Sequence, residues 1–185
     1  MSRVAAVFSI RPATAADAPA IARVHRESWR TSYSGILPAE IVSLESGRRS
    51  EGEWRRRLTR KQPDAETWIA ESAPAGIIGF ASCGEARDRA ITGLDGEIYA
   101  LYVVQQYHRR GVGRALVREC ARHFVRNGLF GLYAWVLRAN HARLFYEALG
   151  GEEVGHKTER LGLHGYAQVA YGWHDLTALV TGEAR

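Results

Sequence analysis

The sequence predicts a mixed β-sheet flanked by helices, in the α/β or α+β class. Three observations lead to this prediction. A chain of 185 residues is long enough for one domain with a buried core. Some segments carry apolar residues at helical spacing, whereas others are short runs rich in Ile, Val, Tyr and Trp. Strands and helices alternate along the chain instead of forming separate blocks.

The first third of the chain is predicted to be mostly helical. Thr14 is a candidate N-cap, with Asp17 as its capping-box partner. Trp54 and Leu58 are expected on the buried side of an arginine-rich helix. The predicted elements are a strand over residues 7–10, followed by helices over about residues 15–31, 38–44 and 47–60.

The rest of the chain is predicted to alternate between strands and helices. Gly128 is the expected C-terminal stop of a long helix, and Asn140 is the expected cap of a short one. Strands are expected over residues 67–71, 76–83, 97–104 and 130–137, helices over 111–127 and 140–149, and two last strands over 152–161 and 166–176, joined at His164 and Gly165. No repeat or linker divides the sequence, so residues 1–185 are expected to form one domain with a core over about residues 8–176.

The composition is that of a folded protein, with 46% hydrophobic and 24% charged residues. No apolar run is long enough to cross a bilayer, and the N-terminus lacks the features of a secretory signal. We therefore expect a cytoplasmic protein with no membrane partner. Cys83 and Cys120 stand in apolar surroundings without metal-ligand spacing, which predicts buried reduced thiols and no metal.

The net charge of +5 favours an anionic partner. Much of this charge is concentrated in residues 48–61, which raises the alternative of a nucleic-acid-binding module. However, Glu51 and Glu53 interrupt the basic run, and Trp54 and Trp68 suit buried positions better than a stacking platform. A solvated helix face is the favoured interpretation, with no nucleic acid as a partner.

A second group of arginines surrounds a glycine-rich turn between a predicted strand and a predicted helix. The N-terminus of a helix offers free N–H groups and a partial positive charge. Gly111 and Gly113 would let this backbone approach an anion closely, and Arg109, Arg110 and Arg114 would add positive charge. This combination favours a diphosphate as the ligand, although the glycines could instead shape a tight turn. The Walker and Rossmann glycine patterns are both absent.

The segment His108-Arg109-Arg110-Gly111-Val112-Gly113 resembles the signature of the GCN5-related N-acetyltransferase superfamily, in which His108 replaces the usual Gln or Arg. Residues 97–103 resemble the strand that precedes this signature. Residues 135–150, with Asn140, Tyr146 and a Leu-Gly stop, resemble a later motif. The likeness covers about residues 10–176. It implies a mostly antiparallel sheet, in which the central strand and the next one splay apart at a bulge where the cofactor binds.

The resemblance implies that acetyl-CoA is the acyl donor. Its pantetheine arm would pair with the strand backbone at Leu101, Tyr102 and Val103, and an N–H within residues 100–102 would stabilise the oxyanion. Asn140 would order the cofactor arm. The implied pyrophosphate cradle consists of His108, Arg109, Arg110, Gly111, Val112, Gly113, Arg114 and Ala115.

Catalytic roles follow from the same resemblance. Tyr146 matches the general acid of the family, although it could be a core tyrosine with a hydrogen-bonded hydroxyl. Glu97 is the candidate base, or else a solvated strand end. Strict alternation would place it on the same face as Tyr99, Leu101 and Val103. In the loop region that covers the acceptor in related proteins, Trp29 and Tyr33 are candidate substrate contacts, with core packing as the alternative.

The expected activity is acetyl transfer from acetyl-CoA to a primary amine of a small molecule, either an amino acid or an amino-acid-like compound. Acetylation of a protein N-terminus or lysine is the alternative, because acceptor choice lies in loops that the sequence does not explain. A CoA-binding domain without catalysis also stays open. Since dimers are common in the family, a homodimer is a further open expectation.

Overall fold

The computed structural model describes residues 8–48, 50–60 and 65–182. These residues form one seven-stranded sheet in the order β1-β2-β3-β4-β5-β7-β6. All neighbouring strands are antiparallel except β4 and β5, which are parallel. The strands are β1 (Ser9–Pro12), β2 (Glu66–Ser72), β3 (Gly76–Glu85), β4 (Gly96–Val103), β5 (Leu132–Leu137), β6 (Glu152–Leu161) and β7 (His164–Trp173).

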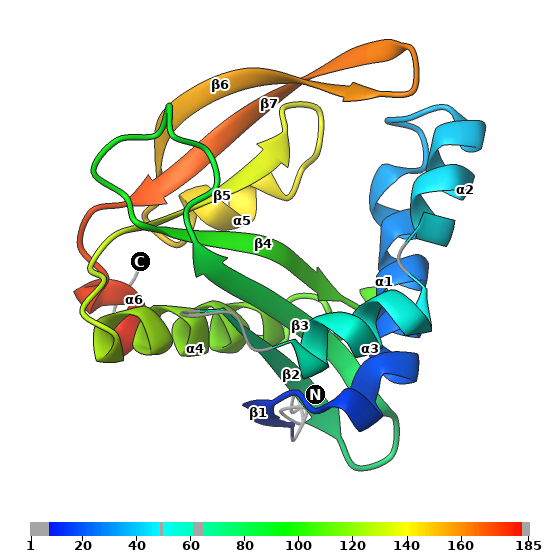
Figure 1. Cartoon of the computed structure of the whole chain (residues 1–185), viewed down its shortest axis with the longest axis horizontal. Coiled ribbons are helices and arrows are strands. Elements are labelled where there is room, and N and C mark those ends of the chain that lie inside the picture. Colours follow the sequence, from blue (N-terminus) through cyan, green and yellow to red (C-terminus); the bar gives the residue numbers. More distant parts are fainter. Residues whose placement is uncertain (1–7, 49, 61–64, 183–185) are drawn as a thin grey trace, which may run out of the picture.

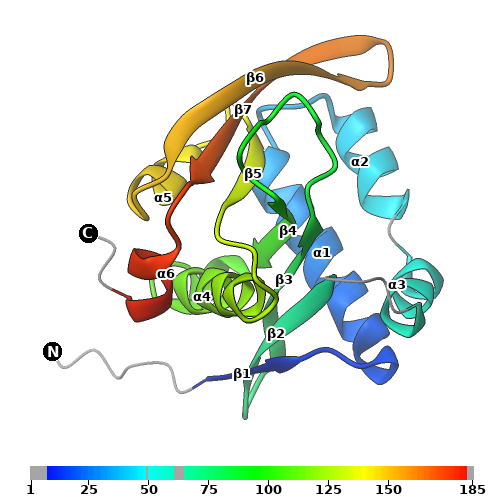
Figure 2. The ribbon, with the colours of Figure 1, turned by 60° about the vertical axis from the view of Figure 1, so that its left-hand side comes forward.

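Helices cover both faces of this sheet (Figures 1 and 2). Helix α4 packs on one face beside the short α6, and α1 packs on the other face beside α2 and α3. The helices are η1 (Ala15–Asp17), α1 (Ala18–Tyr33), α2 (Ala39–Arg48), α3 (Glu51–Thr59), η2 (Gln105–Tyr107), α4 (Val112–Arg126), α5 (Arg143–Glu147) and α6 (Thr177–Thr181). The predicted fold class is confirmed.

Two apolar clusters, one on each face, hold the layers together. On the α4 face, Leu116 and Phe124 are fully buried against the sheet. On the α1 face, Ile21 packs with Trp54 and Phe80. Each such side chain contributes roughly 1.5–3 kcal/mol by leaving water. Trp54 lies on the buried side of α3, as its helical spacing predicted.

The hydrogen-bond ladder between the two parallel strands, β4 and β5, is short. Strand β5 pairs with β4 only from Gly96↔Leu132 to Ile98↔Ala134. Beyond that point β5 continues beside β7 as far as Leu137, whereas β4 continues beside β3. The two strands therefore separate in the middle of the sheet, as the family resemblance implied.

Several predicted boundaries were wrong. Residues 47 and 48 belong to α2, and α3 begins at Glu51 after the Ser50 cap; residues 7, 49 and 61 lie outside the described part of the chain. The last hairpin does not turn at His164 and Gly165. It turns two residues earlier, at Gly162 and Leu163, where Gly162 adopts the left-handed φ of +63° that a tight turn needs. The predicted last strand ends at Trp173, and α6 follows it.

Asp17 is the polar anchor at the start of the helical segment. Its carboxylate accepts hydrogen bonds from the backbone N–H of Thr14 at 2.8 Å and from both terminal nitrogens of Arg11 at 2.8 Å. The predicted capping box is therefore present, although it begins η1 rather than α1 directly. The Arg11 hydrogen bonds, aided by Thr14, lower the pKa of Asp17 to about 2.

The low pKa of Asp17 predicts a defined effect of Asp17→Asn. At neutral pH the variant should lose roughly 1–2 kcal/mol of unfolding free energy, because the ionised carboxylate is favoured in the folded state. The group has its ordinary pKa of about 4 when unfolded, so its contribution is complete above that pH. The contribution should disappear as the pH falls through the folded pKa of about 2.

Urea unfolding of both proteins at a series of pH values measures this difference. Glu27→Gln, which removes an exposed pair with Arg23 at 3.4 Å, is the control and should change stability by less than about 0.5 kcal/mol. A constant gap between wild type and Asp17→Asn down to pH of about 2 would contradict the assignment.

Candidate active site

A β-bulge in β4 organises the centre of the sheet. In the pairing of β3 with β4, Ser82 lies opposite Ala100 and Cys83 lies opposite Ile98. Tyr99 is therefore an extra residue with no counterpart on β3. A bulge of this kind breaks the alternation of side chains and bends its strand.

The bulge overturns the prediction that Glu97 shares a face with Leu101 and Val103. Leu101 and Val103 pack against the α4 cluster, as Ile98 does. Glu97 lies on the opposite face, where it borders a cleft together with Tyr99 and Tyr102. Strict alternation fails here because the extra residue shifts the pattern by one position.

The backbone of β4 after the bulge is paired on one side only. Residues 100–103 keep their partners on β3, from Ser82↔Ala100 to Gly79↔Val103. In the described pairing, β5 offers them no partner, because its ladder with β4 ends at Ile98. An extended chain could add to this edge as a further strand does. Leu101, Tyr102 and Val103 all lie on it.

The glycine-arginine turn lies between this edge and α4. Gly111 has a φ of +82°, and a Cβ added there would meet no atom within 4 Å. At Gly113 a side chain would be crowded, because an added Cβ would lie 3.2 Å from the ring of Phe145. The first backbone bond of α4 runs from Ala115 to Gly111 at 2.9 Å, so the helix N-terminus begins within the turn.

Two other residues of the turn have unusual geometry. Arg109 has a φ of +57° and is the non-glycine residue with positive φ in the described chain. The ring Nε2 of His108 lies 2.8 Å from the carbonyl oxygen of Val103. The imidazole thus ties the turn to the end of β4.

Tyr146 is buried where α5 meets the sheet. Its ring stacks on Tyr171, with centroids 6.2 Å apart. Burial raises the pKa of Tyr146 above its ordinary value, and the nearby phenol of Tyr33 adds to this effect. The hydroxyl is therefore protonated at neutral pH. Asn140 does not cap α5 in the predicted way; Ala142 is the N-cap, and Asn140 Oδ1 accepts the Ala142 N–H at 2.9 Å.

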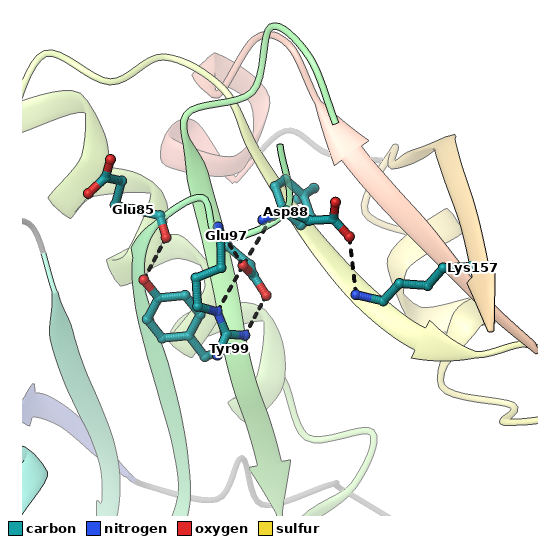
Figure 3. A network of polar contacts seen from close by, with 7 residues as sticks. Glu85, Asp88, Glu97, Tyr99 and Lys157 are labelled. Atoms are coloured by element: carbon teal, nitrogen blue, oxygen red, sulfur yellow. Dashed lines mark hydrogen bonds and ion pairs between the residues drawn. The ribbon is translucent and has the colours of Figure 1, made fainter. Parts of the chain in front are cut away.

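Glu97 is the centre of a polar network (Figure 3). The residue as a whole is 3% exposed. Arg87 donates to it from Nη2 at 2.5 Å, from Nε at 3.0 Å and from its backbone N–H at 3.0 Å. The Tyr133 hydroxyl donates at 3.1 Å, and burial raises the pKa of that phenol to about 12, which keeps it a donor. Paired in this way, the carboxylate tolerates burial.

The cleft beside Glu97 has a volume of about 510 Å³. Trp29 and Tyr33, the predicted substrate contacts, both line it, and their rings lie 4.1 Å apart. The structure thus brings together Glu97, Tyr102 and these two aromatics. The other lining residues are Glu45, Arg87, Asp88, Ile98, Tyr99, Trp135, Leu137, Lys157, Glu159, Leu161 and Gln168.

Arg87 and Lys157 are among the lining residues that escaped the sequence analysis. Arg87 lies in the loop between β3 and β4, and Lys157 lies on β6. No local motif marks them, because they meet only through the pairing of distant strands. Across the described ranges, no group of His, Cys, Asp and Glu side chains could hold a metal ion, and no helix is long and apolar enough to cross a membrane.

A sheet that opens at its parallel pair, beside a helix N-terminus and an aromatic cleft, is the arrangement that the resemblance to N-acetyltransferases implied. The comparisons with known proteins agree. A model of the Acetyltransferase (GNAT) family matches residues 23–150. The chain therefore belongs to the GNAT family of acetyltransferases and is an N-acetyltransferase by class.

Relatives and solved structures extend this result. An uncharacterized N-acetyltransferase of Bacillus subtilis, YuaI, is 32% identical over 95% of this chain and 98% of its own. The spermidine N(1)-acetyltransferase of Thermoplasma acidophilum is 24% identical over 80% of this chain and 89% of its own. The PaiA N-acetyltransferase of the same organism, solved with coenzyme A, has a TM-score of 0.68 at 20% identity and covers 90% of this chain and 99% of its own.

The turn geometry predicts opposite effects for two glycine substitutions. Gly111→Ala should lower the unfolding free energy by about 1–2 kcal/mol, because a side chain disfavours the left-handed φ. Gly47→Ala is the matched control: Gly47 lies within α2, has no positive φ and has open space around its Cβ position. It should stabilise by up to about 1 kcal/mol. Chemical denaturation measures both, and equal effects would contradict the turn conformation.

Proposed function

We propose that this N-acetyltransferase moves an acetyl group from acetyl-CoA to a primary amine of a small molecule, namely an amino acid or a close analogue. The observation that carries the proposal is the cleft beside Glu97. Its volume of about 510 Å³ lies within the range of small-molecule sites. Its aromatic walls and its charged side chains, most of which are paired with one another, suit a compact polar ligand that must be oriented.

The cofactor would lie along the free edge of β4. In this proposal the amide groups of the pantetheine arm pair with the backbone of Leu101, Tyr102 and Val103, while the pyrophosphate meets the start of α4 at residues 109–115. His108 contributes by holding this turn to Val103. The Asn140 side chain orders the chain before α5, next to the cofactor arm.

The reaction then proceeds at the bulge. The amine nitrogen attacks the thioester carbonyl carbon, and a backbone N–H of residues 100–102 stabilises the oxyanion. The C–S bond breaks as the amide forms, and the departing sulfur takes a proton from Tyr146. The ammonium loses two protons in all. One passes through water to Glu97, whose Oε1 accepts one described hydrogen bond, from Arg87 Nη2, and from there to solvent, and the other restores the phenol of Tyr146.

Thiol release from acetyl-CoA tests the proposal. The purified protein is offered a panel of amino acids, simple amines and polyamines, together with peptides that end in a free amine or contain lysine. Turnover with a small molecule supports the proposal. Turnover with peptides alone would indicate a protein acceptor, and CoA binding without turnover on any amine would indicate a non-catalytic domain.

Tyr146→Phe should retain acetyl-CoA affinity but lose at least about 100-fold in kcat, because the phenol proton is needed only as the thiolate departs. Calorimetry measures the affinity and thiol release measures the rate. Tyr171→Phe is the control, since it removes the hydroxyl of the ring that stacks on Tyr146 and keeps the stack. An unchanged rate for Tyr146→Phe would remove this residue from the mechanism.

Glu97→Gln should lower kcat/KM most strongly near neutral pH, where nearly all of an alkyl amine is protonated and a base is required. The deficit should shrink as the pH approaches the amine pKa of about 10. A deficit independent of pH would instead indicate that Glu97 only positions Arg87. Glu85→Gln, on the neighbouring strand and exposed, is the control and should show no such profile.

A further inference from the structure

The guanidinium group of Arg87 uses one of its hydrogen-bonding edges and leaves another open. A guanidinium carries N–H donors along more than one edge. The edge formed by Nε and Nη2 is bound by Glu97, at 3.0 and 2.5 Å. The face of the group lies over the Tyr99 ring, 4.0 Å from its centroid. Among the described residues, none forms a hydrogen bond or ion pair with Nη1, and the side chain, which lines the cleft, is 58% exposed.

The position of Arg87 is also rigidly determined. Its own backbone N–H donates to Glu97 at 3.0 Å. The next backbone N–H, that of Asp88, donates to the Tyr133 hydroxyl at 3.1 Å, and the same hydroxyl donates to Glu97. A guanidinium held in this way loses little conformational freedom when it binds a ligand.

Most of the acidic side chains that line the cleft are already paired with a cation. Three of its four acidic side chains already have cationic partners: Glu97 pairs with Arg87, Asp88 with Lys157 at 3.2 Å, and Glu45 with Arg48 at 2.7 Å. Lys157 also lies over the Trp135 ring, 4.1 Å from its centroid. A planar anion with two oxygens matches the free edge of Arg87.

We propose that Arg87 binds the carboxylate of the acceptor, and that the acceptor is therefore an α-amino acid rather than a simple amine or polyamine. The inference rests on the proposed function. Arg87 contacts Glu97 and Tyr99, which border the bulge, so a carboxylate held here places the adjacent α-amine near β4. The side chain of the acceptor then faces the wall formed by Trp29, Tyr33 and Leu137.

A polyamine fits this arrangement less well. It has no acceptor atom for the open guanidinium edge, and three of the four carboxylates that could attract its ammonium groups are already paired with Arg or Lys. Glu159 is the acidic lining residue for which no cationic partner is described, and it lies on β6, away from the bulge. The observations therefore favour a zwitterionic acceptor.

Matched acceptor pairs test the inference. Each pair consists of an amino acid and the amine left after its decarboxylation: phenylalanine with phenethylamine, leucine with isoamylamine, and lysine with cadaverine. The corresponding amino-acid amide keeps the shape without the charge. Rates are compared at equal concentrations of neutral amine. For the preferred side chain, kcat/KM should be at least about 10-fold higher with the carboxylate, as expected for charge-assisted hydrogen bonds.

Arg87→Met should reduce this preference at least about 10-fold, mainly through KM, and Arg87→Lys should restore part of it. The preference is a ratio measured within one protein, so partial loss of folded enzyme does not affect it. Arg89→Met is the control: Arg89 is exposed, lies in the same loop and does not line the cleft. It should leave the preference unchanged.

The possible outcomes separate the two proposals. Equal or better turnover of decarboxylated amines or spermidine by the wild type would overturn the carboxylate assignment while leaving small-molecule acetylation intact. A preference for amino acids that survives Arg87→Met would show that another group binds the carboxylate. Absence of turnover with every small amine would overturn the proposed function and this inference together.

Discussion

The extra residue in β4 is the constraint on which the rest of the site depends. Because Tyr99 has no counterpart on β3, the strand bends there, and its ladder with β5 ends one residue earlier, at Ile98. A regular strand would have continued to pair with β5 and closed the sheet. The bulge instead leaves the backbone of residues 100–103 with one side unpaired in the middle of the molecule.

The same bulge decides which side chains face the cleft. It directs Glu97 and Tyr99 to the α1 face and leaves Leu101 and Val103 with α4. Glu97 is 3% exposed, and a carboxylate buried in this way needs partners, which the loop before β4 supplies through Arg87. The position of that loop is therefore coupled to the strand. A change that straightened β4 would disturb the free backbone edge, the burial of Glu97 and the orientation of Arg87 together.

The sequence alone predicted those features that local chemistry determines. Thr14 and Asp17 formed their capping box, Gly128 took its left-handed φ after α4, and Trp54 faced the core. The family resemblance implied a bulge where the central strands splay apart, but its position at Tyr99 was not predictable, because the run from Glu97 to Val103 contains no glycine or proline to mark it. Arg87 and Lys157 were missed because they become neighbours of the cleft only when distant strands pair. The hairpin offered two glycines, and only the conformation distinguished Gly162 from Gly165.

In the proposed reaction, the bulge places the proton donor and the proton acceptor on opposite sides of β4. An ammonium that becomes an amide loses two protons, of which one ends on the departing sulfur and one leaves to solvent. Tyr146 belongs to the cluster on the α4 face, whereas Glu97 borders the cleft on the α1 face. Proton donor and proton acceptor are thus separated by the strand on which the tetrahedral centre would form. With strict alternation, Glu97 would have faced α4, on the same side as Tyr146, and no base would have bordered the cleft that admits the amine.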